Sequence, residues 1–412
     1  MMQRRQFLRH AAGGTAALWT APWSLGATGV APSDQVQLAV IGVGSRGRWM
    51  MEQALQVPGV RLRALCEVYE PHTAQAHETL AGLEVPVYTD YRALLDQESE
   101  LDAVLIATPL GVHAGPMIAA AERGLHIYGE KALAFTQDEC DAVVRAVQQH
   151  GVHFQIGHQY RHAPRVKRAV ERILAGEIGR VTHIYAYWHR NNNWRRPVPD
   201  PAHELHVNWR LYDTWSRGLL AELGSHQVDF ANWIFGETPT AVLGSGGIDT
   251  YHDGRQTYDN VQALFTYPSG GSFFFSSILN NHKMGYQIHV MGTEGTAELR
   301  FEDAWFYYEP WRPNSAVPKR EEGASWAQST PSLSVEGDRP YDGPGAYVEL
   351  PEDDPGGSAD YRALRAFFED LRADTRPWAD EVVGWNATAP ILAGQRAVRT
   401  GEPQIIPTWN GG

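Results

Sequence analysis

The chain has 412 residues, which is too long for one ordinary domain and long enough for two domains with separate cores. Its 35 Lys and Arg against 48 Asp and Glu give a formal net charge of −13, which excludes the basic surface that nucleic-acid binding requires. Hydrophobic residues make up 43% of the chain, as in a globular protein, and the 14 Trp include enough indoles for some to stack on sugars.

The first 31 residues have the order of an export signal. The stretch RRQFL (residues 4–8) precedes a run of small, weakly apolar residues at 11–27. It resembles a twin-arginine signal, and a disordered basic arm is the alternative. We therefore expect residues 1–31 to direct the chain to the twin-arginine export machinery and the mature protein to be periplasmic or otherwise exported. No other apolar run approaches the roughly 18 residues that cross a bilayer, so we expect no membrane span.

Strands and helices alternate over residues 35–157. Short apolar runs predict strands, and periodic segments between them predict helices. The helix that follows Thr136 carries Glu139 at the spacing of a capping box. The expected strands lie at 36–41, 60–66, 101–108, 125–131 and 152–157, and the expected helices at 48–56, 91–97, 113–124 and 136–151. This rhythm predicts a doubly wound parallel sheet, as in α/β proteins of the Rossmann type.

A different pattern begins at residue 158 and continues to residue 412. An amphipathic helix at 164–179 and a long strand at 180–190 are followed by strand-like sequence at 241–300. Pro268–Gly271 predicts a hairpin turn within that sequence. We expect a surface excursion at 311–354, rich in Pro, Gly, Ser and Glu, and further helices at 219–235 and 359–373. These features predict a second domain over residues 158–412.

Two cysteines, Cys66 and Cys140, are the only ones in the chain. They exclude a zinc framework or a CxxC redox pair. Because Cys66 ends an apolar strand and Cys140 lies in an expected helix, we expect both to be buried thiols rather than a disulfide.

A glycine-rich turn, Gly42-Val-Gly44-Ser-Arg-Gly47, joins the first expected strand to the first helix. Glycines allow the tight turn and the close approach of a diphosphate, and the helix N-terminus donates N–H groups to it. Glu67 ends the next strand, where a carboxylate would bind the ribose diol. No Lys or Arg follows it closely, which favours NAD over NADP, although a plain turn with a solvated Glu67 fits the same letters.

Lys131 and one helix carry the candidate catalytic groups. Lys131 follows a parallel strand at the sheet edge where ligands bind, although a solvated lysine fits that position equally well. Glu222, His226 and Asp229 are spaced i, i+4 and i+7, so a regular helix would present them on one face. A carboxylate one turn from a histidine can orient its ring as a general base, and a solvated polar face is the alternative.

Five segments together resemble the Gfo/Idh/MocA oxidoreductase family. They are AVIGVGSRG, LCEVYEPH, IATPLGVHAGPMIAAAERGLHIYGEKALA, GHQYRHAPRVKRAVERILAGEIGRV and GSHQVDFANW. The resemblance implies an α/β chain, with an N-terminal Rossmann doubly wound parallel sheet and a C-terminal α+β domain built on a large, mostly antiparallel sheet. It also implies a homo-oligomer. The proline of the family's Glu-Lys-Pro motif is replaced by Ala132, and the family's Asp-x-x-x-His becomes Glu222 and His226.

The resemblance assigns roles to named positions. Lys131, His226 and Glu222 would be catalytic, with His226 taking the proton of a substrate hydroxyl, Lys131 binding its oxygen and Glu222 holding the imidazole. Contacts to a tightly bound NAD would come from Gly42, Gly44, Ser45, Arg46, Gly47, Glu67, Thr108, Pro109, His113, Glu130 and Lys131. The expected substrate contacts are Tyr160, Arg161, His189, Asn193, Trp194, Arg195, Asn208, Trp209 and Asp229, and no metal is expected.

Three functions remain open from the sequence. The first is oxidation or reduction of a sugar or cyclitol hydroxyl with NAD that stays bound and is restored within each turnover. The second is a redox glycosidase, which needs another acid or base such as Tyr160 or Tyr212. The third is an exported sugar-binding protein with a structural NAD, a hypothesis that the presence of both Lys131 and His226 disfavours.

Overall fold

A computed structural model describes residue 31, residues 34–309 and 345–409 except 351, 353 and 355, and residue 411. The expected signal segment, apart from residue 31, lies outside the described residues, as do residues 311–344 of the expected surface excursion. Within the described chain, no helix combines the length and apolar character needed to span a membrane.

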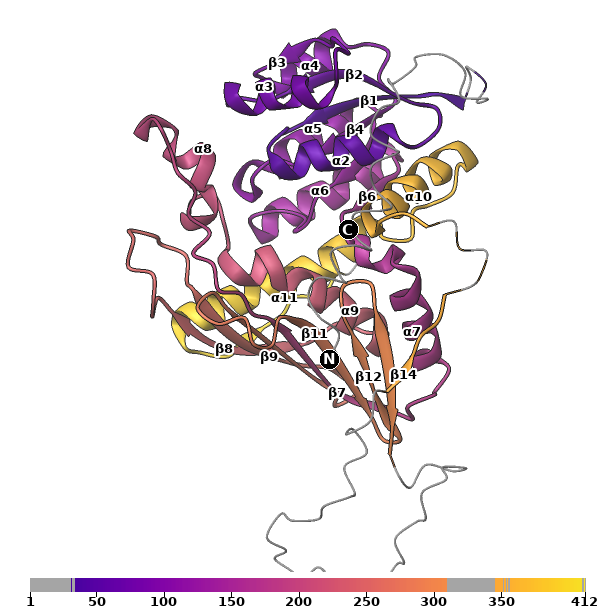
Figure 1. Cartoon of the computed structure of the whole chain (residues 1–412), viewed down its shortest axis with the longest axis vertical. Helices are drawn as coiled ribbons and strands as arrows, with labels where there is room; N and C mark the ends of the chain where they lie inside the picture. The colour runs from indigo at the N-terminus through magenta and orange to yellow at the C-terminus, as the bar shows by residue number, and fades with distance from the viewer. Residues whose placement is uncertain are drawn as a thin grey trace, which may run out of the picture.

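The N-terminal domain is a Rossmann sheet of six parallel strands (Figure 1). The strands are β1 (Val36–Ile41), β2 (Val60–Cys66), β3 (Val87–Tyr88), β4 (Ala103–Ile106), β5 (His126–Gly129) and β6 (Phe154–Ile156), in the order β3-β2-β1-β4-β5-β6. The helices are α2 (Ser45–Leu55), α3 (Glu70–Thr79), α4 (Tyr91–Gln97), α5 (Ala114–Glu122) and α6 (Gln137–His150). The strand order reverses between β1 and β4, where such sheets bind nucleotides.

Local sequence signals explain where several of these elements begin and end. The Thr136 side chain accepts a hydrogen bond from the Glu139 amide, and Glu139 bonds back to the Thr136 amide, which confirms the expected capping box at the start of α6. Gly151 then ends α6 in the left-handed conformation. Both cysteine thiols are free and buried, as expected, and burial raises the pKa of Cys66 to about 12.

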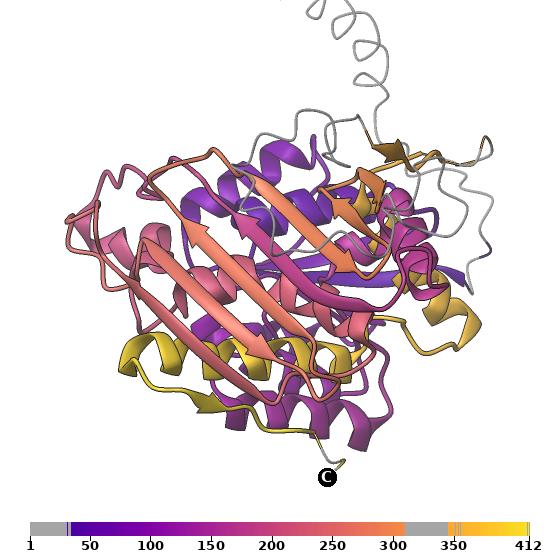
Figure 2. The ribbon, with the colours of Figure 1, turned by 90° about the horizontal axis from the view of Figure 1, so that it is seen from below.

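The C-terminal domain is built on a nine-stranded sheet, seen face-on in Figure 2 with helices behind it. Its strands are β7 (Val181–Trp188), β8 (Ala241–Gly247), β9 (Asn260–Thr266), β10 (Ser272–Ile278), β11 (Tyr286–Gly292), β12 (Gly295–Leu299), β13 (Ala304–Tyr308), β14 (Ala346–Tyr347) and β15 (Gln404–Ile405). The helices are α7 (Pro164–Leu174), α8 (Glu204–Asn208), α9 (Ser225–Phe235), α10 (Ala359–Ala373) and α11 (Glu381–Thr400). All strand pairs are antiparallel except β7 with β10, so the fold class expected from the sequence is confirmed.

One helix of the C-terminal segment completes the Rossmann domain. Phe367 and Phe368 of α10 are fully buried in the cluster that contains Val40 and Leu105 of the parallel sheet. Each buried phenylalanine stabilises this packing by about 1.5–3 kcal/mol relative to an exposed one. The nucleotide-binding domain therefore consists of more than residues 35–157, because the chain returns to it after building the second sheet.

Candidate active site

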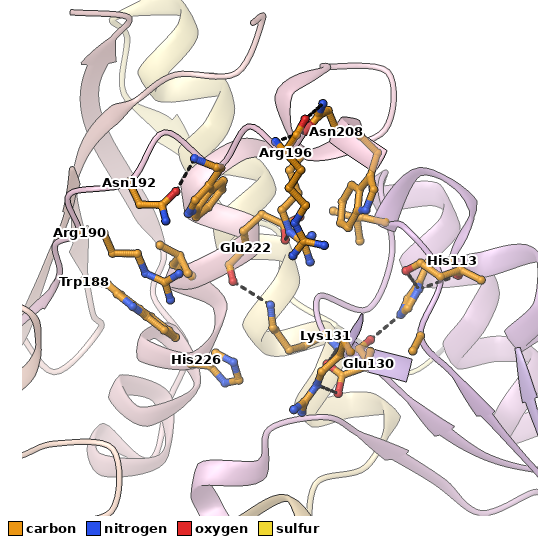
Figure 3. Close-up of a pocket in the computed structure, with 18 of the residues that line it drawn as sticks. His113, Glu130, Lys131, Trp188, Arg190, Asn192, Arg196, Asn208, Glu222 and His226 are labelled. Carbon is orange, nitrogen blue, oxygen red and sulfur yellow. Dashed lines mark hydrogen bonds and ion pairs between the residues drawn. The ribbon is translucent and has the colours of Figure 1, made fainter. Parts of the chain in front are cut away.

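A cleft of about 550 Å³ opens at the carboxyl ends of the Rossmann strands, where the two domains meet. The first domain contributes the loops after β4 and β5, and the second contributes the end of β7, the residues around α8, and the start of α9 (Figure 3). Polar, charged and aromatic side chains dominate its lining. They include Arg46, Thr108, His113, Glu130, Lys131, Tyr160, Trp188, Arg190, Asn192, Trp194, Arg195, Arg196, Asn208, Trp209, Arg210, Glu222 and His226. Ligands of open α/β sheets bind at this edge.

The glycine turn has the shape that a dinucleotide requires. Gly42 has a φ of +86°, and a Cβ there would lie 2.9 Å from the Ala107 backbone. A Cβ on Gly47 would lie 1.9 Å from the Gly42 carbonyl oxygen. A Cβ on Gly44 would meet only the His72 ring, at 3.5 Å. Protein packing therefore explains Gly42 and Gly47, whereas Gly44 leaves open the space above the turn that a diphosphate would occupy.

Glu67 is fixed beside this turn. Its Oε2 accepts a hydrogen bond of 3.0 Å from the Val43 amide, and its Oε1 accepts bonds from the Val68 and Tyr69 amides. Burial alone would raise the pKa of Glu67, but hydrogen bonds from His72 and the nearby amides hold it below its ordinary value. An ionised, oriented carboxylate at the end of β2 fits the ribose diol of NAD.

One basic side chain lies near Glu67, although no Lys or Arg follows Glu67 closely in the sequence. Arg48 lies in α2, donates a hydrogen bond to the Val43 carbonyl, and is close enough to Glu67 for their charges to interact. The absence of a Lys or Arg shortly after Glu67 in the sequence did not exclude a guanidinium from the preceding helix.

Four of the expected cofactor contacts, Arg46, Thr108, His113 and Glu130, are bonded within the protein. The His113 ring bonds Thr108 and the Glu130 carbonyl, which ties the loop after β4 to the end of β5. Arg46 pairs with Glu130 and with Asp360 of α10, each at 2.8 Å. These residues line the cleft. The other expected cofactor contacts Gly42, Gly44, Gly47, Ser45, Glu67 and Pro109 lie outside its lining as described.

Lys131 is half-buried after the end of β5 and reaches across to the second domain. Its Nζ donates a hydrogen bond of 2.8 Å to the backbone carbonyl of Glu222. Burial lowers the pKa of Lys131, with the charges of Glu222 and Glu130 opposing that effect. The Lys131–Ala132 peptide bond is cis.

His226 faces Lys131 across the cleft, and its ring is 4% exposed (Figure 3). Its neighbours are aromatic, with ring centroids of His158, Tyr160 and Trp188 at 5.6, 4.9 and 6.0 Å. No described residue forms a hydrogen bond with its ring nitrogens, which leaves them for a ligand. Burial, together with the charges of Lys131 and His158, lowers the pKa of His226 well below its ordinary value. The imidazole is therefore neutral at pH 7 and able to accept a proton.

The expected contact between Glu222 and the His226 ring is absent from the described part of the chain. The Glu222 carboxylate instead pairs with Arg210 at 2.9 Å and accepts a longer bond from Ser216. The reason is local geometry, because residues Leu220–Gly224 form a π-helical turn ahead of α9. The wider turn breaks the i, i+4 relationship that a regular α-helix would give.

Asp229 and Arg161 were expected to bind substrate, and that role stays a prediction, because both side chains are engaged with each other within the protein. They form a forked ion pair with each other at 2.7 and 2.8 Å, and are 2% and 6% exposed. Neither lines the cleft as described. Two buried charges need this mutual compensation, so the pair holds α9 against the segment after β6.

The remaining expected substrate residues divide between the cleft and its supports. Tyr160, Trp194, Arg195, Asn208 and Trp209 line the cleft. His189, whose ring bonds Ser276, and Asn193, whose side chain accepts from the Arg195 amide, lie outside its lining as described, so their contact with substrate stays a prediction. Trp188, Arg190, Arg196 and Arg210 also line the cleft and were not among the expected substrate contacts.

The family models match both domains. Residues 36–158 match a model described as an oxidoreductase family with an NAD-binding Rossmann fold, and residues 166–298 match the GFO/IDH/MocA C-terminal domain. The Rossmann model and the fit of the glycine turn and Glu67 together identify NAD as the cofactor of the first domain.

Known proteins of similar sequence act on varied carbohydrates. The chain is 32% identical over 235 residues to a 2,7-anhydro-N-acetylneuraminate hydratase of Mediterraneibacter gnavus. The aligned region covers 56% of this chain and 57% of the hydratase. It is 28% identical to the scyllo-inositol 2-dehydrogenase (NAD(+)) of Bacillus subtilis over 64% of this chain and 73% of that protein. The match to the hydratase thus spans little more than half of that protein.

Among solved structures, a levoglucosan dehydrogenase in complex with NADH and levoglucosan has a TM-score of 0.71. It is 20% identical, and the superposition covers 91% of this chain and all of that one. This likeness supports the two-domain fold.

Proposed function

This chain belongs to the Gfo/Idh/MocA oxidoreductase family, and from that premise we propose that it oxidises a hydroxyl of a sugar or cyclitol, or reduces the corresponding ketone. The convergence of Lys131 and His226 on one cleft carries the proposal. The two side chains come from different domains and meet beside the nucleotide-binding edge of the sheet.

The chemistry follows from the protonation states of these two residues. The neutral imidazole of His226 accepts the proton of the substrate hydroxyl as general base. Lys131 keeps N–H bonds beyond the one it donates to the Glu222 carbonyl, and these bind the same substrate oxygen as negative charge develops on it. NAD, when bound, accepts the hydride that leaves the carbinol carbon.

Glu222 supports this arrangement through its backbone. Its carbonyl positions Lys131, and its carboxylate holds Arg210 at the wall of the cleft. The π-helical turn at Leu220–Gly224 places that carbonyl at the domain boundary. Such turns are frequent at functional sites.

A single-turnover experiment tests the proposal. Purified protein loaded with NAD is mixed with a panel of sugars and inositols, and the near-ultraviolet absorbance of the reduced nicotinamide is followed. A substrate deuterated at the reacting carbon should slow the absorbance change. If no sugar or inositol reduces the bound nucleotide, the proposed reaction is wrong.

One further observation favours a redox glycosidase as the second candidate. Tyr160 lines the cleft with its ring 4.9 Å from the His226 ring, and burial raises its pKa, so it remains a proton donor at neutral pH. Tyr212, the other tyrosine considered, bonds Glu204 instead and lies outside the lining as described. A glycoside substrate that exchanges its C2 proton with deuterated water would support this candidate, whereas a C2 proton that is retained would exclude it.

A further inference from the structure

Six basic side chains line the cleft, and three of them are paired with carboxylates of the described chain. Arg46 pairs with Glu130 and Asp360, Arg195 with Glu204 and Asp253, and Arg210 with Glu222, while Lys131 bonds a backbone carbonyl. The other two are Arg190 and Arg196, and neither forms an ion pair with any carboxylate of the described chain.

Arg196 faces the nucleotide side of the cleft. Its backbone amide and carbonyl are both held by the Asn208 side chain, which fixes the loop (Figure 3). The charges that act on its guanidinium belong to Arg210 and to Arg48, the residue that follows the glycine turn. Arg196 therefore interacts with Arg48, on the helix that follows the glycine turn, rather than with a carboxylate of the described chain.

Arg190 lies on the other side, among aromatic rings at the end of β7. Its Cζ is 4.9 Å from the Trp188 ring centroid and 6.0 Å from that of Trp194. Asn192 accepts a hydrogen bond from the Trp194 amide, and Trp194 has a φ of +62°, so the loop turns tightly to bring this indole over the guanidinium. The two indoles restrict Arg190 to a fixed position at the cleft wall.

The position of Arg190 relates it directly to the reacting centre. The Trp188 indole contacts both groups, with the Arg190 guanidinium at 4.9 Å and the His226 ring at 6.0 Å. The guanidinium and the imidazole therefore lie no farther apart than these two distances together. One sugar ring with a charged substituent can bridge that separation.

A half-buried cation without a partner is costly unless a ligand provides the opposite charge. The Arg190 guanidinium is close to Tyr160 and Arg210, and neither supplies a negative charge at neutral pH. Its planar fork matches the two oxygens of a carboxylate.

We propose that Arg190 binds a carboxylate on the substrate, so that the enzyme acts on a sugar acid in preference to the neutral sugar. This inference rests on the proposed oxidoreductase function. It makes Arg190 a specificity-determining residue, since a neutral sugar of the same shape would leave the guanidinium without its counter-charge. The carboxylate would anchor one end of the sugar while His226 and Lys131 act on a hydroxyl at the other.

The test compares matched substrates on protein loaded with NAD. The probes are D-glucuronate, D-galacturonate and D-mannuronate, their neutral parent hexoses, and the hexose 6-phosphates. We expect kcat/KM for the best uronate to exceed that of its parent by about 100-fold, the value of a charge-assisted forked hydrogen bond. Quenching of tryptophan fluorescence measures binding separately, and the Kd of the uronate should rise with salt while that of the hexose does not.

Variants at Arg190, with a control outside the cleft, assign the effect. Arg190→Gln should abolish the preference for the uronate, and Arg190→Lys should retain part of it because the charge remains without the fork. Arg63→Gln is the control, since that guanidinium pairs with Glu100 outside the cleft lining, and it should leave the uronate-to-hexose ratio unchanged.

Each contrary result has a distinct meaning. Hexoses that reduce the bound NAD faster than their uronates would overturn the inference and leave the proposed oxidoreductase function standing. A preference for the 6-phosphates, or an equal loss on both substrates in Arg190→Gln, would also overturn it. If no probe reduces the bound NAD, the proposed function and the inference fall together.

Discussion

The Nζ atom of Lys131 donates a hydrogen bond of 2.8 Å to the backbone carbonyl of Glu222, and this bond crosses the boundary between the two domains. Lys131 follows β5 of the parallel sheet, whereas Glu222 lies in the π-helical turn ahead of α9. The position of the lysine therefore depends on both domains, and any motion between them would move its ammonium group relative to His226.

Replacing Lys131 by Met should lower kcat by about 10²–10³, because the developing charge on the substrate oxygen would lose its donor. The nucleotide should stay bound, since Lys131 faces the cleft and its ammonium group bonds the second domain. Stopped-flow reduction of bound NAD measures the rate, and release of nucleotide on denaturation measures occupancy. Lys283→Met, at an exposed position, is the control. A Lys131→Met rate within a few-fold of the parent would remove this lysine from the mechanism.

Replacing His226 by Ala should lower turnover by about 10²–10⁴ through loss of the general base. Fold and bound nucleotide should be preserved, because no described residue hydrogen-bonds the ring. His183→Ala, on the exposed side of β7, controls for the loss of an imidazole elsewhere. Circular dichroism and nucleotide content distinguish a catalytic defect from misfolding. Near-normal turnover in His226→Ala would exclude the base role.

The pH dependence of sugar oxidation should show a broad plateau. Burial lowers the pKa of His226 well below its ordinary value of 6.5, so the base remains deprotonated and kcat/KM falls only at pH values well below 6.5. Burial also lowers the pKa of Lys131 from 10.5, so the alkaline fall should begin below pH 10.5 as the donor loses its proton. A profile with its acid limb centred at or above pH 6.5 would contradict the neutral imidazole.

The sequence predicted the fold through repeated local signals, because strand–helix alternation, a capping box and a glycine turn depend on neighbouring residues. It also predicted the residues that meet in the cleft where a short motif fixes the backbone, as with Lys131 after β5. The return of α10 to the Rossmann domain was not predicted, since contacts such as that between the rings of Phe367 and Tyr128 join segments far apart in the chain.

The features of the site that were not predicted likewise depend on irregular local geometry or on contacts between distant segments. The helix periodicity that placed Glu222 beside His226 assumes a regular α-helix, and the letters of Leu220–Gly224 do not reveal a π-helical turn. The ion pair between Arg161 and Asp229 joins two polar residues that each looked available for a ligand. The sequence also could not predict that Arg190 lacks an ion pair with the described carboxylates, because this depends on which carboxylates pair with the other arginines.

The bound nucleotide should be NAD, and Glu67 together with Arg48 should determine that preference. Removing the Glu67 carboxylate in Glu67→Ser leaves the Arg48 guanidinium beside the ribose position, where it can pair with the 2′-phosphate of NADP. Titration of nucleotide-free protein should therefore show weaker NAD binding and stronger NADP binding in Glu67→Ser. The double variant Glu67→Ser/Arg48→Gln should lose the gain for NADP. Release of NADP from the parent protein would contradict this assignment.

Finally, we expect NAD to stay bound and to be recycled in each turnover, because residues 201–217 of the second domain contact the first. We call this segment the strap. Residues 201–217, which include α8, rise beside the Rossmann domain (Figure 1). Their His203 and His206 rings lie 5.0 and 6.0 Å from the ring of Tyr69, two residues after Glu67, and the Gly111 amide donates to the Trp215 carbonyl at 3.0 Å. These contacts fall after β2 and after β4, on both sides of the glycine turn, and we expect them to slow the release of a bound dinucleotide.

Retention would also suit an exported protein, which the arginines at positions 4 and 5 lead us to expect, since nucleotide lost outside the cytoplasm could not be replaced. We expect NAD-loaded protein, gel-filtered and given no free NAD, to complete many turnovers with a sugar and a keto-sugar acceptor. Exchange with isotopically labelled NAD should be slower than turnover. Tyr69→Ala removes the two ring contacts with His203 and His206, worth about 0.5–1.5 kcal/mol each, along with a third to His72. It should speed that exchange roughly 10-fold, whereas Tyr185→Ala on β7 should not. Protein that stops after one equivalent and resumes only when free NAD is added would show that the cofactor dissociates in each cycle and that the strap does not retain it.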